Sequence, residues 1–115
     1  MLPKVLRLVK SREFAQIYKN GERLSSPNLR IFYASKKNQN ASRFGFVISK
    51  KQARKIAARN RIKRILRAHI AKLKSEIQPG FEVVFHGRPG ILRLEGGEIR
   101  KELENLLKRG RIIKI

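Results

Sequence analysis

Basic side chains are concentrated in one segment of the chain, residues 50–67, which reads KKQARKIAARNRIKRILR. Nine of these eighteen residues are Lys or Arg, and none is acidic. Such side chains bind anions, and the Arg fork matches two oxygens of one phosphate group. An idle protein surface normally mixes positive and negative side chains. The segment therefore predicts binding to RNA or DNA rather than a solvated basic face.

The apolar residues that follow show how this segment is held. Helical spacing places four apolar residues on one side, namely Ile62, Leu66, Ile70 and Leu73. The opposite side carries Asn60, Arg61, Arg64 and Arg67, with Lys63 at its margin. The amide of Asn60 can both donate and accept, which suits a ribose hydroxyl or a base edge. We expect a helix that packs on its own protein through one side and faces nucleic acid with the other.

The acidic residues do not favour a metal-dependent protein nuclease, which needs clustered carboxylates. The chain has no Asp, and no cluster of its eight Glu residues is evident. Glu98 and Glu102 are expected to pair with neighbouring Lys and Arg on a helix. His69 is expected to be packed and hydrogen-bonded, and His86 is a candidate for contact with RNA. We expect no catalytic residue and no metal site in the protein, which would supply binding and electrostatics.

The charge of the whole chain agrees with a polyanionic partner. Lys and Arg number 29 against 8 acidic residues, a net charge of +21, and no acid lies between Glu22 and Glu76. Such a field repels itself in a compact monomer, so we expect it to serve a polyanion. A membrane surface fits less well, because it calls for an amphipathic helix without a competing core. A ribosomal protein would have the same composition, so charge gives a class of function only.

Residue patterns around the basic segment predict an α+β fold in which helices pack on a small sheet, in one RNA-binding domain over residues 1–115. Alternation of apolar and polar residues indicates strands, and helical spacing with cap signals indicates helices. The expected helices are Ser11–Asn20, a long basic helix that begins near Arg54 to Ala57 and ends before Pro79, and Glu98–Lys108. The expected strands are Arg23–Ser25, Leu29–Ala34, Arg43–Ser49 and Phe81–Phe85.

Composition also bears on where the protein acts. The chain has no Cys, so it offers no disulfide framework and no thiolate metal site. No apolar run approaches the roughly 20 residues that span a bilayer. Residues Met1 to Lys10 alternate apolar with basic residues, unlike a signal peptide. We expect a cytoplasmic protein without a membrane partner.

The motifs together resemble one known family. The run from Arg43 to Lys51, RFGFVISKK, followed by RNRIKR from Arg59 to Arg64 and by Arg67, resembles the signature of the bacterial ribonuclease P protein. Further positions are similar to that family, namely Arg7-Leu8, Phe14, Tyr18, Asn20-Gly21, a strand ending at Tyr33, and the Val83-Val84 strand. The resemblance covers about Leu2 to Lys108 and is far more specific than a basic patch. The segment His86-Gly87-Arg88 departs from the family pattern, so its role stays open.

The resemblance implies a fold and a function. The fold would be a two-layer α/β sandwich with a four-stranded sheet and a left-handed βαβ crossover, like domain 2 of ribosomal protein S5. The protein would be the accessory subunit of an endoribonuclease that removes the 5′ leader of precursor tRNA. One protein would bind one catalytic RNA subunit, which would hold most of the Mg²⁺, and no organic cofactor is implied. The alternative from composition, a ribosomal or other structural RNA-binding protein, stays open here.

The resemblance also assigns two groups of binding residues. The RNA subunit would contact Arg59, Asn60, Arg61, Lys63, Arg64 and Arg67. A cleft between the first helix and the sheet would hold the single-stranded leader through Phe14, Tyr18 and Tyr33, with Ser49 and Lys51 near its edge.

The residues alone leave the leader-binding assignment open. Aromatic rings can stack on bases of any sequence. Phe14, Ile17 and Tyr18 at helical spacing are nevertheless more often core residues. Gly45 and Ser49 are small, which would leave room for a nucleic-acid backbone across the sheet.

Overall fold

A computed structural model of the protein describes residues 7–8, 11–36 and 40–113. All the expected helices and strands are present, and most of their boundaries shift by a few residues. The expectation for Met1–Lys10 falls outside the described residues except at Arg7 and Leu8. The elements are α1 (Ser11–Asn20), β1 (Glu22–Ser25), β2 (Leu29–Ser35), β3 (Arg43–Val47), α2 (Ile56–Lys72), β4 (Phe81–Gly87) and α3 (Gly96–Arg109), with short 3₁₀ helices at Lys74–Glu76 and Ile91–Arg93.

The four strands form one mixed sheet in the order β1-β2-β4-β3. The pairs β1–β2 and β2–β4 are antiparallel, and β3–β4 is parallel. The connection from β3 through α2 to β4 therefore joins parallel neighbours, as the expected crossover requires. Its left-handed sense stays a prediction. The expected α+β class with a four-stranded sheet is confirmed.

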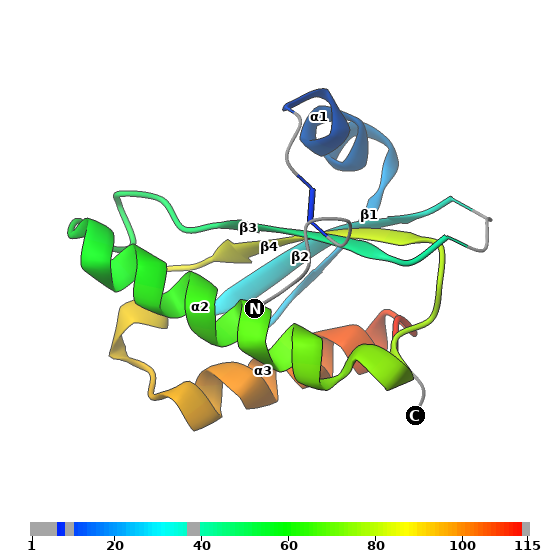
Figure 1. Ribbon diagram of the computed structural model, residues 1–115. Helices are drawn as coiled ribbons and strands as arrows, with labels where there is room; N and C mark the ends of the chain where they lie inside the picture. Colours follow the sequence, from blue (N-terminus) through cyan, green and yellow to red (C-terminus); the bar gives the residue numbers. More distant parts are fainter. Residues whose placement is uncertain (1–6, 9–10, 37–39, 114–115) are drawn as a thin grey trace.

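Helices cover both faces of the sheet, and Figure 1 shows α2 and α3 below it and α1 above it. Because side chains alternate across a strand, each strand supplies both faces. In β4, Val83 and Phe85 join the large core between the sheet and the helices α2 and α3, whereas Val84 joins a small cluster between the sheet and α1. The predicted buried side of α2 is confirmed, since Ile62, Leu66, Ile70 and Leu73 are all buried.

Two carboxylates on α3 do something other than expected. Glu98 lies in a capping box, where its side chain accepts from the backbone N–H of Glu95 at 2.9 Å. Glu102 accepts from the backbone and the side-chain amide of Asn28, at 2.9 and 2.7 Å, and from the hydroxyl of Ser26. The expected ion pairs on the helix are therefore wrong. Both carboxylates instead accept hydrogen bonds from N–H and O–H groups. The partner of Glu98 is at the start of α3, and the partners of Glu102 lie in the loop before β2.

None of the helices in the described part of the chain is both long enough and apolar enough to cross a membrane.

Candidate nucleic-acid interface

The first helix lies close to the sheet because of a glycine beneath it. A Cβ atom added to Gly45 would lie 2.6 Å from Cε1 of Phe14, closer than real Cβ contacts. The Phe14 ring therefore occupies the space above Gly45, and with Leu8, Ile17 and Val84 it forms the small cluster under α1. The expectation that this space holds a nucleic-acid backbone is corrected, since the protein's own aromatic ring fills it.

Arg43 on β3 links α1 to the sheet through its guanidinium. Its guanidinium donates to both carboxylate oxygens of Glu13 on α1, at 2.5 and 3.0 Å, and lies 3.5 Å from Glu82 on β4. It also donates to the backbone carbonyl of Arg7 at 3.4 Å. A bidentate pair fixes orientation as well as distance. The position of α1 over the sheet is therefore defined at two points, Phe14 and Arg43.

Beyond Phe14, three rings from three elements form an aromatic cluster, Tyr18 on α1, Phe32 on β2 and His86 on β4. Ring centroids lie 4.9 Å apart for Tyr18–Phe32, 5.4 Å for Tyr18–His86 and 5.1 Å for Phe32–His86, all edge to face. The hydroxyl of Tyr18 and Nε2 of His86 are hydrogen-bonded at 2.6 Å. Tyr18 is nevertheless 41% exposed, so this ring remains open to a ligand.

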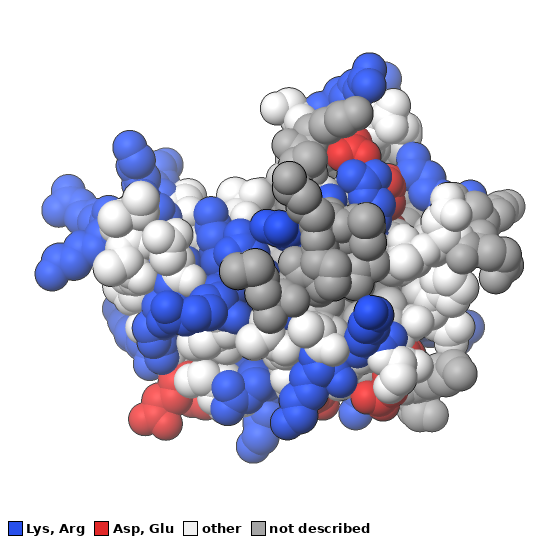
Figure 2. Space-filling model, viewed as in Figure 1, with Lys and Arg blue, Asp and Glu red and all other residues white. Residues whose placement is uncertain are grey.

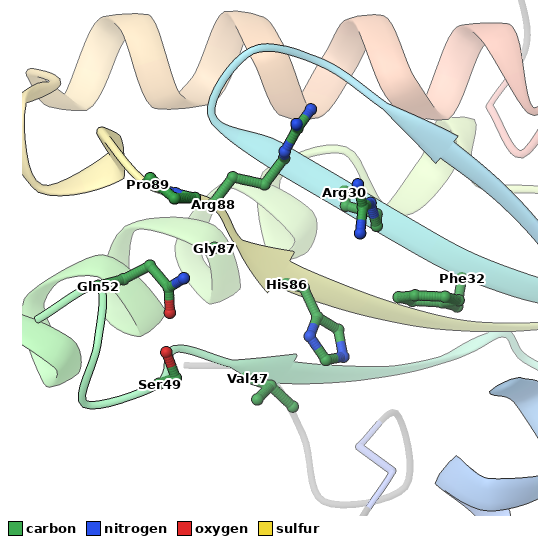
Figure 3. A pocket seen from close by; sticks show the side chains of 9 residues that line it. All are labelled: Arg30, Phe32, Val47, Ser49, Gln52, His86, Gly87, Arg88 and Pro89. Atoms are coloured by element: carbon green, nitrogen blue, oxygen red, sulfur yellow. The ribbon is translucent and has the colours of Figure 1, made fainter.

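A cavity of about 360 Å³ adjoins the aromatic cluster. Figure 3 shows its wall, with Phe32 and His86 on one side and Ser49 and Gln52 on the other. The lining residues are Arg30, Phe32, Val47, Ser49, Gln52, His86, Gly87, Arg88 and Pro89. Two guanidiniums, an amide and a hydroxyl offer hydrogen-bond donors here, and no lining residue is acidic. The aromatic cluster and this cavity together are called the cleft. Rings for stacking beside hydrogen-bond donors are what binding of single-stranded nucleic acid requires.

The structure places Tyr33 away from this cleft and so corrects its grouping with Tyr18. Tyr33 packs against the large core, on the opposite sheet face from Phe32. Its ring reaches Gly110, where an added Cβ would lie 3.4 Å from Cζ. Burial, followed by a hydrogen bond with Glu22, raises the pKa of Tyr33. Neighbouring residues of a strand point to opposite faces, so Phe32 takes the position expected of Tyr33.

The remaining residues expected at the leader cleft differ in position. Ser49 is exposed and lines the cavity. Lys51 is exposed on the loop between β3 and α2 but is not among the lining residues. Phe14 is half-buried and lies 6.5 Å from Tyr18, ring to ring. Contact of these three residues with a leader stays a prediction.

The basic helix α2 lies on the face of the sheet opposite to α1 (Figure 1). Figure 2 shows Lys and Arg side chains along α2 and at its amino-terminal end. Asn60 and Arg64 are exposed, whereas Arg61 and Lys63 are half-buried at the flanks. The helix begins without a side-chain cap and has no acid in its first turn. Its positive end charge therefore adds to the basic side chains and favours a bound anion.

Two of the six residues expected on this surface are held by the protein itself. Arg59 donates through Nη1 to the backbone carbonyls of Ala53 and Arg54, both at 2.9 Å. Arg67 lies over the ring of Phe46, with Cζ 5.6 Å from the centroid. Both side chains are half-buried. Arg59 therefore also orders the loop before α2, and the Arg67 guanidinium is held against the edge strand β3.

His69 behaves as the sequence predicts. It is 7% exposed, and Nε2 lies 2.6 Å from a carboxylate oxygen of Glu104 on α3. The pair joins α2 to α3 on the face away from α1. His69 is therefore a packing residue between helices.

Sequence reasoning missed several residues of the cleft. Strand alternation could have identified Phe32, since it shares a face of β2 with Arg30. Arg30, Gln52 and Arg88 carried no local signal, because only the fold gathers them. The basic side of α2 can bind a folded polyanion through charge. The cleft can bind a single strand through stacking and hydrogen-bond donors.

The comparisons with known proteins agree over nearly the whole chain. The family model Ribonuclease P matches residues 2–111. The ribonuclease P protein component of Synechococcus elongatus is 35% identical, covering 97% of this chain and 95% of the relative. The structure of the Staphylococcus aureus RNase P protein matches with a TM-score of 0.89 at 26% identity, covering 96% of this chain and all of the other. The Thermotoga maritima RNase P protein matches with a TM-score of 0.81 at 31% identity, over 90% of this chain and 96% of the other.

Proposed function

The chain belongs to the ribonuclease P protein family, and we propose on that basis that it is the protein subunit of ribonuclease P, acting in removal of the 5′ leader from precursor tRNA. The observation that carries the proposal is the family match over residues 2–111, which includes both the basic helix and the cleft. The alternative of a structural RNA-binding protein without a part in catalysis gains no support from these similarities.

The catalytic RNA subunit is the proposed partner of α2. Its exposed side carries Asn60 and Arg64, with Arg61 and Lys63 on the flanks. Like charges at this spacing repel one another in the free helix, and phosphates relieve the repulsion. Arg59 and Arg67 contribute charge at the margins while holding the loop and the edge strand. One protein per RNA follows if this single helix makes the main contact.

The leader of precursor tRNA is the proposed ligand of the cleft. Tyr18 and Phe32 provide ring surfaces for bases, and the cavity beside them provides donors for the phosphodiester backbone. Stacking tolerates any base, which suits leaders of varied sequence. A mature tRNA has no leader, so the cleft gives the complex a reason to prefer the precursor.

Catalysis belongs to the RNA subunit in this proposal, and that subunit holds most of the Mg²⁺. Support comes from what the carboxylates of this chain already do. Glu13 and Glu82 bind Arg43, Glu102 binds Asn28, and Glu104 binds His69, while Glu98 caps α3. These carboxylates are spread over both faces of the fold. The place of action in this proposal is the cytoplasm.

Reconstitution with a matching RNA subunit tests the proposal. Cleavage of precursor tRNA at low Mg²⁺ is expected to accelerate when the protein is added, because the protein supplies cationic side chains where Mg²⁺ is scarce. The protein alone, free of RNA, is expected not to cleave. Cleavage that does not respond to the protein would contradict the proposed function, and cleavage by the RNA-free protein would contradict the division of labour.

A further inference from the structure

His86 stands at the junction of the aromatic cluster and the cationic cavity. Its Nε2 atom is hydrogen-bonded to the Tyr18 hydroxyl at 2.6 Å, and its ring meets both Tyr18 and Phe32 edge to face. The same ring lines the cavity that holds Arg30 and Arg88 (Figure 3). A single imidazole therefore contacts the proposed stacking surface and the proposed phosphate site at once.

The hydrogen bond to Tyr18 occupies one nitrogen of His86. Burial raises the pKa of Tyr18, so its hydroxyl keeps its proton at neutral pH. This hydroxyl donates to Nε2 in one tautomer of the neutral ring and accepts from Nε2 in the other. Nε2 is therefore engaged with Tyr18 in either tautomer, and Nδ1 is the ring nitrogen left for a ligand.

The groups that face His86 are cationic or uncharged. Its cross-strand partners are Arg30 on β2 and Val47 on β3. Tyr18 contacts it from α1, and Arg88 follows two residues later in the chain. On the same face of β4, the carboxylate of Glu82 is engaged with Lys36 and Arg43. Burial and then the charge of Arg30 lower the pKa of His86 from its ordinary value, so this ring is neutral at pH 7 in the free protein.

The two cavity guanidiniums are already oriented. Arg30 donates through Nε to the hydroxyl of Ser25 at 2.9 Å, and Arg88 donates through Nη1 to the carbonyl of Ser26 at 2.8 Å. Each guanidinium has further N–H groups beyond these bonds. Oriented donors lose little freedom on binding, which favours a compact anion such as a phosphodiester.

We infer that His86 is a proton-linked ligand of the leader phosphodiester, so that a phosphate entering the cavity beside Arg30 and Arg88 is bound together with a proton on His86. The inference rests on the proposed function, because it takes the cleft as the leader site. A phosphate reverses the local charge and stabilises the imidazolium. Both nitrogens of the imidazolium are donors, and the Tyr18 hydroxyl can accept from Nε2, so the hydrogen bond to α1 survives protonation.

Linkage fixes the sign and size of the effect. A group whose pKa rises on binding takes up a proton, so the ligand binds more tightly as the pH falls. A rise of one pKa unit corresponds to about tenfold tighter binding at acid than at alkaline pH. The chain has only two His residues, so few groups can produce this effect near neutrality.

The test measures binding of a fluorescent single-stranded RNA oligonucleotide to the full chain from pH 8 to pH 5.5 at fixed ionic strength. Three proteins are compared, the wild type, His86→Gln, and the matched control His69→Gln, whose site lies on the opposite face. Circular dichroism establishes that each is folded. NMR titration of the His86 imidazole in the wild type, with and without saturating oligonucleotide, reads the same linkage directly and needs no variant.

The expected result is about tenfold tightening toward pH 5.5 in the wild type and His69→Gln, little change in His86→Gln, and a higher His86 pKa in the complex. Binding that tightens equally in His86→Gln, or a His86 titration unmoved by the oligonucleotide, overturns the inference alone. Absence of oligonucleotide binding at every pH overturns the leader cleft as well.

Discussion

Replacing Phe32 and Tyr33 in turn by Leu tests whether strand alternation decides which ring serves the leader. The two residues are neighbours on β2, but Phe32 meets Tyr18 and His86, whereas Tyr33 packs toward α3 and Gly110. Leu keeps an apolar side chain at each position and removes the flat ring face. Only Phe32→Leu is therefore expected to weaken discrimination between precursor and mature tRNA.

The expected size follows from the contacts that each variant loses. A base stacked on an aromatic ring contributes roughly 1–3 kcal/mol, so loss of one stack lowers affinity for the precursor about 5- to 150-fold. Phe32→Leu also loses two edge-to-face ring contacts, at about 0.5–1.5 kcal/mol each. Tyr33→Leu loses its hydrogen bond with Glu22 and its contact at Gly110. Both variants are thus expected to be less stable, which makes each a control for the other.

The assay is the ratio of holoenzyme affinities for precursor and mature tRNA, at a temperature where both variants are folded. The ratio is expected to fall for Phe32→Leu and to stay at the wild-type value for Tyr33→Leu. Equal loss in both variants, or loss only in Tyr33→Leu, would refute the assignment of the cleft to the α1 face. Thermal unfolding of each protein separates loss of stability from loss of binding.

Four further predictions concern the basic helix, the acid response and the packing of the chain. If about six side chains meet phosphates, the logarithm of affinity for the RNA subunit should fall with log salt at a slope of about −4 to −6, and a slope near zero in a salt titration would contradict this. Arg64→Ala should weaken that binding by roughly 1.5–3 kcal/mol without changing leader discrimination, whereas Arg93→Ala, at an exposed position before α3, should change neither; filter binding measures both. Burial alone would raise the pKa of Glu102, but hydrogen bonds from Ser26 and Asn28 bring that pKa below 4.5. The ionised carboxylate therefore stabilises the folded protein above pH 4.5, and this stabilisation is lost as the pH falls through the lowered pKa. In urea titrations, the difference in unfolding free energy between wild type and Glu102→Gln should shrink from about pH 6 to about pH 3. Gly21→Ala should destabilise the fold by about 1–3 kcal/mol, because a Cβ there lies 2.5 Å from the backbone oxygen of Tyr33 and 2.6 Å from that of Ile17, and an unchanged denaturation midpoint would contradict it.

Local patterns predicted the elements of this fold because the signals lie within single segments. The alternation from Arg43 onward predicted β3, and helical spacing of Ile62, Leu66 and Ile70 predicted the buried side of α2. These signals depend on burial of one face, which periodicity reports directly. Boundaries were less certain, since α2 ends at Lys72 rather than just before Pro79.

The basic surface was also predictable from sequence, although not the state of each side chain. Charge without compensating acids is a property of composition, and Arg64 is exposed as expected. Arg59 instead bonds the carbonyls of Ala53 and Arg54, and Arg67 lies over Phe46. Those contacts depend on the path of the loop before α2 and on the edge strand beside it, which no spacing within the helix specifies.

The cleft depended on tertiary structure. The sequence by itself determined a basic RNA-binding α+β protein, because charge and periodicity are read along the chain. Only the fold brought Tyr18 to His86, across 68 residues, and turned Phe32 rather than Tyr33 toward them. It also filled the space above Gly45 with the ring of Phe14. The physical reason is that strand pairing and the placement of α1 decide which faces meet, and both arise from contacts between segments far apart in sequence.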